Sequence, residues 1–331
     1  MKKIIAVLLA VLMVIGAVAL AGCSDNADSS SSKAADTGKT YSIGVCQLVQ
    51  HEALDAATKG FEDYLTEKLG KNVKINVQNA AGDSATCTTI VNQFVSDDVD
   101  LIMANATPAL QAAVSGTTTI PILGTSITDY ATALSIDNWT GATGGNVSGT
   151  CDLAPLDGQA DMLNELFPDA KNVGILYCSA EANSKYQADT ITEYLEKDGY
   201  KVNVYTFADS NDVATVTKTA CDNNDVLYIP TDNTAASCTD AINNVALTAK
   251  VPIIAGEEGI CSGCGVATLS ISYYDLGTAT GEMAYKVLVD GEDISTMQIQ
   301  SAPKFTKEYN KDICKKLGIK VPDDYEAIKA E

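Results

Sequence analysis

Groups that could bind a small molecule follow one of the apolar runs in this sequence. In "YIPTDNTAAS" the apolar run ends at Pro230, and a hydroxyl, a carboxylate and an amide follow at Thr231, Asp232 and Asn233. Side chains of these types cap helices, at about 1 kcal/mol for each cap. A capped helix N-terminus that faces a cleft also presents free N–H groups to a ligand. We therefore expect capping and ligand binding to occur together here.

Similar polar residues follow the other apolar runs. In open parallel sheets, ligands bind beyond the carboxyl ends of the strands, where such residues would meet. Hydroxyls and helix-end amides can bind a carboxylate, and Asp232 or Glu257 can bind an ammonium group. The sequence therefore predicts a site for a zwitterion, with Asp232 as the partner of the ammonium group. The candidate residues are Gln47, Thr107, Thr125, Ser126, Ser179, Asn183, Ser184, Asp232, Asn233 and Glu257.

Few residues could support catalysis or bind a metal. His51 is the only histidine, so a Ser-His-Asp or Cys-His site would need it, and we interpret it as a surface or supporting residue. Cys261 and Cys264 form "CSGC", but a zinc site needs further ligands, and no second CxxC or histidine accompanies them. We interpret this stretch as a loop with a disulfide or free thiols. We expect no catalytic residue, no metal and no cofactor.

The charge of the chain excludes several classes of ligand. Its formal net charge is −21, and it contains no arginine. A nucleic-acid-binding protein needs a basic face that neutralises phosphates, so this class is excluded. A di-anionic ligand would meet net repulsion without the bidentate contacts of arginine. A neutral, zwitterionic or cationic small molecule is therefore favoured.

The candidate residues must be positioned by alternating strands and helices. Apolar runs that predict strands cover 41–49, 73–80, 99–106 and 120–125, and again 172–179, 200–208, 225–232 and 251–259. Helical patterns lie between them, which predicts parallel sheets with helices on both faces. Gly44 and Gly174 are 130 residues apart, Asp100 and Asp225 are 125 apart, and Pro121 and Pro252 are 131 apart. The sequence therefore predicts an α/β protein with two similar Rossmann-like lobes.

The chain is expected to cross between the lobes three times. The predicted crossings are near Ser148–Cys151, Leu269–Tyr274 and Ile299–Pro303. This multi-strand hinge assigns 41–149 and about 274–300 to the first lobe, and 150–273 and about 301–331 to the second.

The N-terminus has the features of an export signal. Lys2 and Lys3 precede an apolar run from Ile4 to Leu20, and "LAGC" follows, which predicts a lipoprotein signal peptide over 1–22 with lipid attached to Cys23. A transmembrane anchor is the alternative, but the run is at the short limit for spanning a bilayer. Residues 23–40 predict a flexible tether. We therefore expect an extracytoplasmic protein anchored to the membrane by lipid.

Nine cysteines remain after Cys23, and an odd number cannot all pair within one chain. Several lie in apolar strand or helix patterns, where cysteine acts as a small hydrophobic residue. We predict mostly free, buried thiols.

Several stretches together resemble a known family. They are "QLVQHEALDAATKGF", "VQNAAGD", "ATPALQAA", "PILGTSITD", "GNVSG", "LFPDAKNVGILYCSAEANS", "YIPTDNTAAS" and "ISYYDLG". On these motifs the chain resembles the solute-binding lipoproteins of ABC importers, of the tryptophan- and tyrosine-binding type. The resemblance implies a periplasmic binding protein fold of type I that closes on an aromatic or other hydrophobic amino acid. It also implies a permease and an ATPase as partners, and it adds Asp152 to the ligand-binding residues.

Two other functions are compatible with the same pattern. A ligand-sensing receptor module would use the same closing lobes. A secreted α/β enzyme would need an activated nucleophile, but the sequence contains no Gly-x-Ser-x-Gly elbow and no complete set of metal ligands. We favour capture of an amino acid by a monomeric binding protein.

Overall fold

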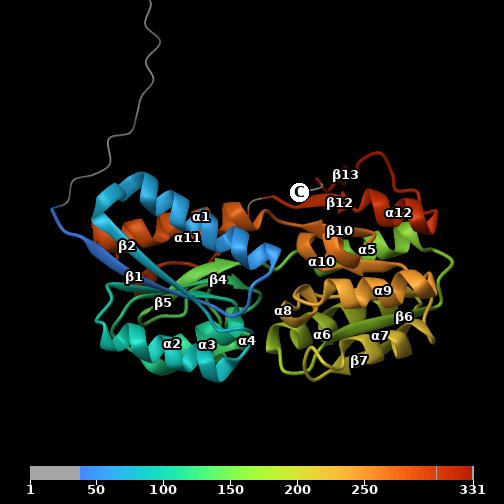
Figure 1. Ribbon diagram of the computed structural model, residues 1–331, viewed down its shortest axis with the longest axis horizontal. Coiled ribbons are helices and arrows are strands. Elements are labelled where there is room, and N and C mark those ends of the chain that lie inside the picture. Colours follow the sequence, from blue (N-terminus) through green and yellow to red (C-terminus); the bar gives the residue numbers. More distant parts are fainter. Residues whose placement is uncertain (1–37, 303, 330–331) are drawn as a thin grey trace, which may run out of the picture. The chain divides into compact units, whose positions relative to one another are not determined.

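Two sheets, each covered by helices, make up the described part of the chain (Figure 1). The computed structural model describes residues 38–302 and 304–329. The predicted signal peptide, Cys23 and most of the predicted tether lie outside these residues. Within them, no helix combines the length and the hydropathy that crossing a membrane requires.

The first sheet has the strand order β11-β5-β4-β3-β1-β2. Its strands are β1 (Tyr41–Gln47), β2 (Val73–Asn79), β3 (Leu101–Asn105), β4 (Ile122–Ile127), β5 (Val147–Cys151) and β11 (Gln300–Ser301). All paired strands in this sheet are parallel. Its helices are α1 (Glu52–Leu69), α2 (Ser84–Ser96), α3 (Thr107–Gly116), α4 (Tyr130–Leu134) and α11 (Tyr273–Tyr285). We call this sheet and these helices the first lobe.

Both faces of the first sheet are buried, which explains the continuous apolar runs of its strands. Ile43 and Val45 of β1 pack with Phe61 of α1 and Met283 of α11. Cys46, on the opposite face, belongs to the cluster that α2 and α3 cover. The period of two along a strand thus supplies apolar side chains to two separate cores.

The second sheet has the order β13-β12-β10-β9-β8-β6-β7. Its strands are β6 (Asn172–Cys178), β7 (Lys201–Phe207), β8 (Val226–Ile229), β9 (Ile253–Ala255), β10 (Ala267–Ser270), β12 (Thr306–Tyr309) and β13 (Glu326–Ala327). Only β12 runs antiparallel to its neighbour β10. Its helices are α5 (Leu156–Leu166), α6 (Ala182–Lys197), α7 (Val213–Cys221), α8 (Asn233–Ala236), α9 (Thr239–Ala249), α10 (Glu258–Cys264) and α12 (Lys311–Leu317). These elements form the second lobe.

The two lobes repeat one topology. The order β2-β1-β3-β4-β5 in the first sheet corresponds to β7-β6-β8-β9-β10 in the second. This correspondence confirms the predicted α/β fold of two similar lobes with parallel sheets. The lobe boundaries drawn from the sequence stay a prediction.

Some local predictions were wrong. The stretch "CSGC" is not a loop, because Cys261 and Cys264 lie in α10 and are buried. The helical pattern between the predicted strands 225–232 and 251–259 forms two helices, α8 and α9. Helix α5, which follows β5 and opens the second lobe, was not among the predicted elements.

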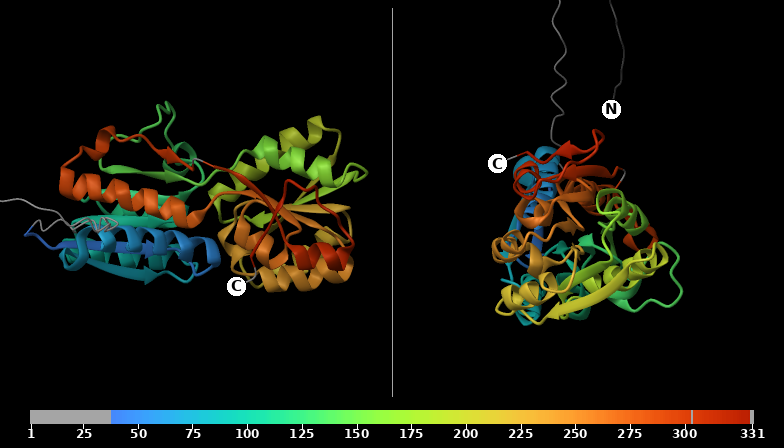
Figure 2. Two further views of the ribbon diagram at one scale, coloured as in Figure 1. Left: turned by 90° about the horizontal axis from the view of Figure 1, so that it is seen from above. Right: turned by 90° about the vertical axis from the view of Figure 1, so that its right-hand side faces the viewer.

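Close packing of α1 against α11 fixes one side of the first lobe, and Figures 1 and 2 both show the two helices side by side. A Cβ atom on Gly60 would lie 2.1 Å from the carbonyl oxygen of Tyr274, and one on Gly277 would lie 1.9 Å from that of Ala57. Glycine at both positions therefore lets the helix backbones approach. The contact holds the N-terminus of α11, where Tyr273 lies, in place.

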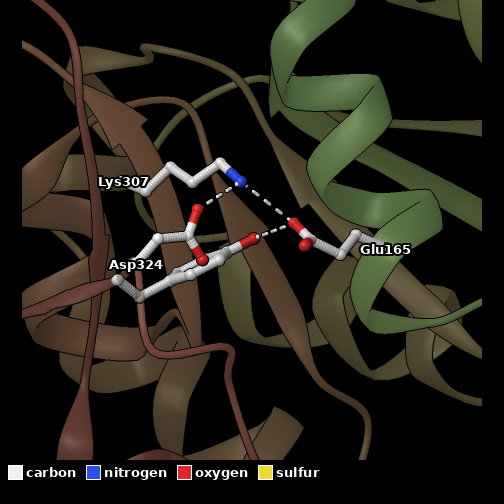
Figure 3. A network of polar contacts seen from close by, with 4 residues as sticks. Glu165, Lys307 and Asp324 are labelled. Atoms are coloured by element: carbon white, nitrogen blue, oxygen red, sulfur yellow. Dashed lines mark hydrogen bonds and ion pairs between the residues drawn. The ribbon is translucent and has the colours of Figure 1, made fainter.

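The C-terminal segment is attached to α5 by a network of polar contacts (Figure 3). Lys307 of β12 lies 3.2 Å from Glu165 of α5 and 2.9 Å from Asp324. The hydroxyl of Tyr325 donates to Glu165 at 2.8 Å. The carboxylates are exposed and Lys307 is half-buried, so we expect the ion pairs to contribute little to stability.

The cysteines of the described chain occupy core positions. Cys46, Cys87, Cys178, Cys221, Cys261, Cys264 and Cys314 are buried, and Cys151 and Cys238 are half-buried. Burial raises the pKa of Cys221 to about 11, which keeps this thiol protonated. Cysteine therefore acts here as a small hydrophobic side chain, as the patterns predicted.

Candidate ligand-binding site

The predicted site residues lie at or just beyond the carboxyl ends of strands in both lobes. In the first lobe these are Gln47 of β1, Thr107 after β3, Thr125 and Ser126 of β4, and Asp152 after β5. In the second lobe they are Ser179, Asn183 and Ser184 after β6, Asp232 and Asn233 after β8, and Glu257 after β9. Three of them, Ser126, Asp152 and Asn183, have a buried polar atom without a hydrogen-bond partner among the described residues.

Ser126 lies at an irregularity of the sheet. The register between β4 and β5 shifts between Gly124 and Ile127, and Ser126 adopts a positive φ of 56°. A non-glycine residue in this conformation stores strain. The hydroxyl oxygen of Ser126 is buried and has no hydrogen-bond partner within residues 38–302 and 304–329. The strained backbone thus positions a hydrogen-bond donor that the described chain does not use.

Asp152 presents one free carboxylate oxygen. Its Oδ2 atom accepts a hydrogen bond from the hydroxyl of Tyr273 at 3.0 Å. Its Oδ1 atom is buried and makes no hydrogen bond of normal geometry within the described chain, although the side chain of Thr128 is a further donor close to the carboxylate. Burial raises the pKa of Asp152 to about 6, although the hydrogen bond from Tyr273 partly offsets this effect. The carboxylate is therefore mostly ionised at neutral pH while one of its oxygens lacks a donor.

Asn183 supplies a second free acceptor from the other lobe. It lies in the first turn of α6, and its Nδ2 atom donates to the carbonyl oxygen of Thr231 at 3.2 Å. Its Oδ1 atom is buried without a donor in the described part of the chain. An unpaired buried polar atom costs about 1–3 kcal/mol.

Gln187 connects the two lobes near these atoms. Its Nε2 atom lies 3.2 Å from the carbonyl oxygen of Thr231, and its Oε1 atom accepts from the backbone N–H of Thr231 at 3.1 Å. The same Nε2 atom lies 3.5 Å from the hydroxyl of Thr128, two residues after Ser126. Thr231 also bonds Asn183, so one network extends from the second lobe to the end of β4. The sequence reasoning missed Gln187, although it lies one helical turn after Asn183 on the same face of α6.

Asp232, which the sequence predicts as the ammonium partner, is hydrogen-bonded to the backbone of its own lobe. It is the N-cap of α8, and its two oxygens accept from the backbone N–H groups of Ala235 and Cys178, each at 2.7 Å. Burial raises its pKa to about 8, and the nearby Glu181 adds to this increase. Both oxygens are thus engaged by the protein itself. Its role as the ammonium partner stays a prediction, whereas Oδ1 of Asp152 makes no hydrogen bond with the described chain.

The comparison with known proteins places the chain in a family. Residues 42–330 match the model of the ABC transporter substrate binding protein family. The chain belongs to this family. Substrate-binding proteins of ABC transporters are extracytoplasmic binding proteins and not enzymes.

Similar proteins agree with this placement. The substrate-binding protein is 38% identical over 324 residues to the tyrosine-binding protein of Clostridioides difficile, over 96% of this chain and 93% of that protein. It is 32% identical to an ABC domain from Streptococcus pneumoniae solved in complex with L-Trp, with a TM-score of 0.83 over 88% of this chain and all of the other. A ligand-free, open substrate-binding protein from Clostridium difficile is 38% identical, with a TM-score of 0.67 over the same shares. The tryptophan/tyrosine-binding type and the predicted type I fold are thereby confirmed.

The other predicted residues of this substrate-binding protein have partners of their own. Both oxygens of Glu257 cap α10 through the N–H groups of Gly259 and Ile260, and burial raises its pKa to about 8. Gln47 is bonded within the first lobe, to Asp55 and Thr58 at 2.6 Å each. Thr125 accepts a hydrogen bond from the hydroxyl of Thr150, and the hydroxyl of Ser179 donates to the carbonyl oxygen of Phe207. Ser184 contacts Asn183 and Asp232, and the side chain of Asn233 donates to Glu181. Thr107 is buried as the first residue of α3.

Glu181 is a buried acid that the sequence reasoning did not single out. It accepts from the Nδ2 atom of Asn233 at 2.6 Å and from the backbone N–H of Thr234 at 2.8 Å. The sequence could have indicated Glu181, because it lies in "CSAEANS", directly after a predicted strand, as the predicted site residues do. It lines a cavity of about 300 Å³ to which the first lobe contributes Leu48, Val49, Ala81 and Pro108 and the second lobe Ala180, Ala208 and Thr234. His51 reaches the same region, where its Nε2 atom lies 3.3 Å from Oδ1 of Asn233.

Metal binding has no support in this site. Among the described residues, no group of three or more His, Cys, Asp or Glu side chains could hold a metal ion. The predicted site residues themselves supply hydroxyl, amide and carboxylate groups, which suit an organic ligand.

Proposed function

We propose that this protein captures the zwitterion of an aromatic or other hydrophobic amino acid between its lobes. The observation that carries the proposal is that three of the predicted site residues each have a buried polar atom without a hydrogen-bond partner in the described chain. Two are acceptors, Oδ1 of Asp152 and Oδ1 of Asn183, and suit an ammonium group. The third, the hydroxyl of Ser126, is a donor and suits a carboxylate. The acceptors come from both lobes, so the ligand would bridge the cleft.

The carboxylate of the ligand would be bound without a cationic side chain. The first turn of α3 begins at Thr107, and its free N–H groups offer donors of the kind that bind anions at helix N-termini. We assign the hydroxyls of Thr107, Thr125 and Ser126 to this end of the ligand. The hydroxyl of Ser179 would join them only by giving up its hydrogen bond to the carbonyl oxygen of Phe207. The mixture of donors and acceptors matches a zwitterion and disfavours a di-anion.

Closure of the lobes would depend on the ligand. Closing the empty site buries three unpaired atoms at about 1–3 kcal/mol each, which favours an open form in the absence of ligand. A ligand that supplies the missing partners removes this cost only when both lobes contact it. The higher TM-score to the L-Trp complex than to the more identical open structure is consistent with a closed arrangement in this chain.

The names of the relatives support the ligand class. One is a tyrosine-binding protein, and another was solved with L-Trp. We therefore propose that this chain delivers its amino acid to an ABC permease that is driven by a cytoplasmic ATPase, and that it is a monomer attached to the membrane by lipid on Cys23. A sensor module that presents the same ligand to a receptor remains the second candidate, and transport of labelled amino acid by cells with and without the gene separates the two.

Calorimetry of the mature protein with each of the twenty amino acids tests the ligand class. We expect dissociation constants in the micromolar range or below for one or more of the aromatic amino acids, and far weaker binding of aspartate and glutamate. The absence of any binding tighter than about 1 mM would overturn the proposal. Mass spectrometry of the membrane-associated protein tests the lipid on Cys23.

A further inference from the structure

We infer that Tyr273 is a positioning residue that holds Asp152 so that one carboxylate oxygen remains free for the ammonium group of the ligand. This inference rests on the proposed function and deepens it, because it names what orients the acceptor. The hydroxyl of Tyr273 donates to Oδ2 of Asp152 at 3.0 Å. Oδ1, which receives no hydrogen bond from the described chain, is thereby left to the ligand.

Tyr273 is itself held firmly. Its side chain is only 5% exposed, and it is the first residue of α11. Ser272 caps this helix by accepting from the backbone N–H of Asp275 at 3.1 Å, and the glycine contacts with α1 fix the helix laterally. The phenol therefore has one orientation relative to the first lobe. A rigid donor of this kind fixes the carboxylate plane in advance of ligand binding.

Tyr273 also connects Asp152 to the second lobe. Thr231 lies close to the phenol, and Thr231 is the residue that Asn183 and Gln187 contact. The phenol thus links the acceptor of the first lobe with the acceptor of the second. We infer that it aligns the two acceptors for one ammonium group when the lobes close.

The groups that face Asp152 determine the pH range of binding. They are Tyr130 of α4, Cys151 of β5 and Tyr273 of α11, and Glu257 of the second lobe faces Tyr273 in turn. None of these four carries a positive charge. Burial raises the pKa of Asp152 to about 6, and the hydrogen bond from Tyr273 acts in the opposite direction. Ligand affinity should therefore fall as the pH decreases through about 6, because the neutral acid no longer pairs with the ammonium group.

Loss of the Tyr273 hydroxyl should raise the pKa of Asp152 further. The hydroxyl stabilises the charged carboxylate, so its removal favours the neutral acid. The pH at which half of the affinity is lost should move upward by about one unit, the equivalent of one hydrogen bond to a charged group. A purely structural role of Tyr273 would lower the melting temperature without moving this midpoint.

The chain offers a matched control. Tyr228 is also fully buried, and its hydroxyl donates to the side chain of Gln159 inside the second lobe. The substitution Tyr228→Phe removes the same atom from a comparable environment without affecting Asp152. Any difference between the two variants therefore reports on the contact with Asp152.

The experiment is calorimetry of the wild type, Tyr273→Phe and Tyr228→Phe with L-tyrosine and L-tryptophan between pH 5 and pH 8. We expect Tyr273→Phe to weaken binding at pH 6.5 by about threefold and to move the midpoint upward, while Tyr228→Phe keeps the wild-type midpoint. Equal midpoints in all three proteins would overturn the inference. Failure of the wild type to bind any amino acid would instead overturn the proposed function itself.

A second variant covers the case in which Tyr273→Phe does not fold. Incorporation of 3-fluorotyrosine at position 273 keeps the hydroxyl and strengthens it as a donor, so the midpoint should move downward. An unchanged midpoint in this protein would also contradict the inference. The two substitutions thus predict shifts in opposite directions.

Discussion

Replacement of Asp152 by asparagine should change affinity and stability in opposite directions. The substitution keeps the shape of the side chain and removes its charge. The ligand then loses a charge-assisted hydrogen bond to its ammonium group, which is worth about 1.5–3 kcal/mol and corresponds to a loss of about 10- to 150-fold in affinity. The hydroxyl of Tyr273 can still donate to the amide oxygen, so we expect the local packing to persist.

The stability of the ligand-free protein should increase. The pKa of Asp152 is raised from 3.8 to about 6, a difference of about two units, so the charged form is disfavoured in the folded state by up to about 3 kcal/mol at pH 7. This penalty is fully present above pH 6 and disappears as the pH decreases towards 4. Asp152→Asn should therefore unfold at higher urea concentration than the wild type at pH 7 and at a similar concentration at pH 4.

Urea titrations at pH 7 and pH 4 and calorimetry with L-tyrosine measure both effects. Asp232→Asn is the matched control, because the oxygens of Asp232 are engaged by the N–H groups of Ala235 and Cys178. We expect this variant to be less stable, because the single amide oxygen can accept from only one of these two N–H groups, but to bind within about threefold of the wild type where it is folded. If Asp232→Asn abolishes binding while Asp152→Asn binds normally, the assignment of the ammonium group to Asp152 is refuted.

Further substitutions test other parts of the structure. Ser126→Gly should relieve the strain of the positive φ of 56° and should not lower the melting temperature. It should weaken amino-acid binding by about tenfold, because one hydroxyl donor is lost. Undiminished affinity would contradict the role of Ser126. Gly277→Ala should reduce the free energy of unfolding by about 2 kcal/mol or more, because the added Cβ would lie 1.9 Å from the carbonyl oxygen of Ala57. An unchanged free energy of unfolding in urea would show that α1 and α11 can separate. Lys307→Met should change the free energy of unfolding by less than about 1 kcal/mol, because its partner Glu165 is exposed, and a larger loss would mean that the network in Figure 3 is cooperative.

Much of the fold could be predicted from local patterns. Strands buried on both faces, such as "LIMAN" in β3, are apolar up to the final Asn105 and are recognisable from the sequence alone. Helix α10 could not be recognised in this way, because "EGICSGC" contains two glycines and is short. It forms because Glu257 caps its first turn and because Ile260 and Cys264 enter the core of the second lobe. Burial and capping here outweigh low helix propensity.

The sequence by itself determined which types of polar group stand at the strand ends, and hence that a small zwitterionic ligand is favoured. It singled out Asp232 and reached Asp152 only through the family resemblance, because "GNVSGTC" before Asp152 is not a continuous apolar run. Only the tertiary structure decided that the oxygens of Asp232 are engaged by backbone N–H groups, one of them from Cys178, while Oδ1 of Asp152 is left without a donor among the described residues. The physical reason is that hydrogen-bond satisfaction depends on neighbours brought together by folding, such as Tyr273, which is 121 residues from Asp152 along the chain.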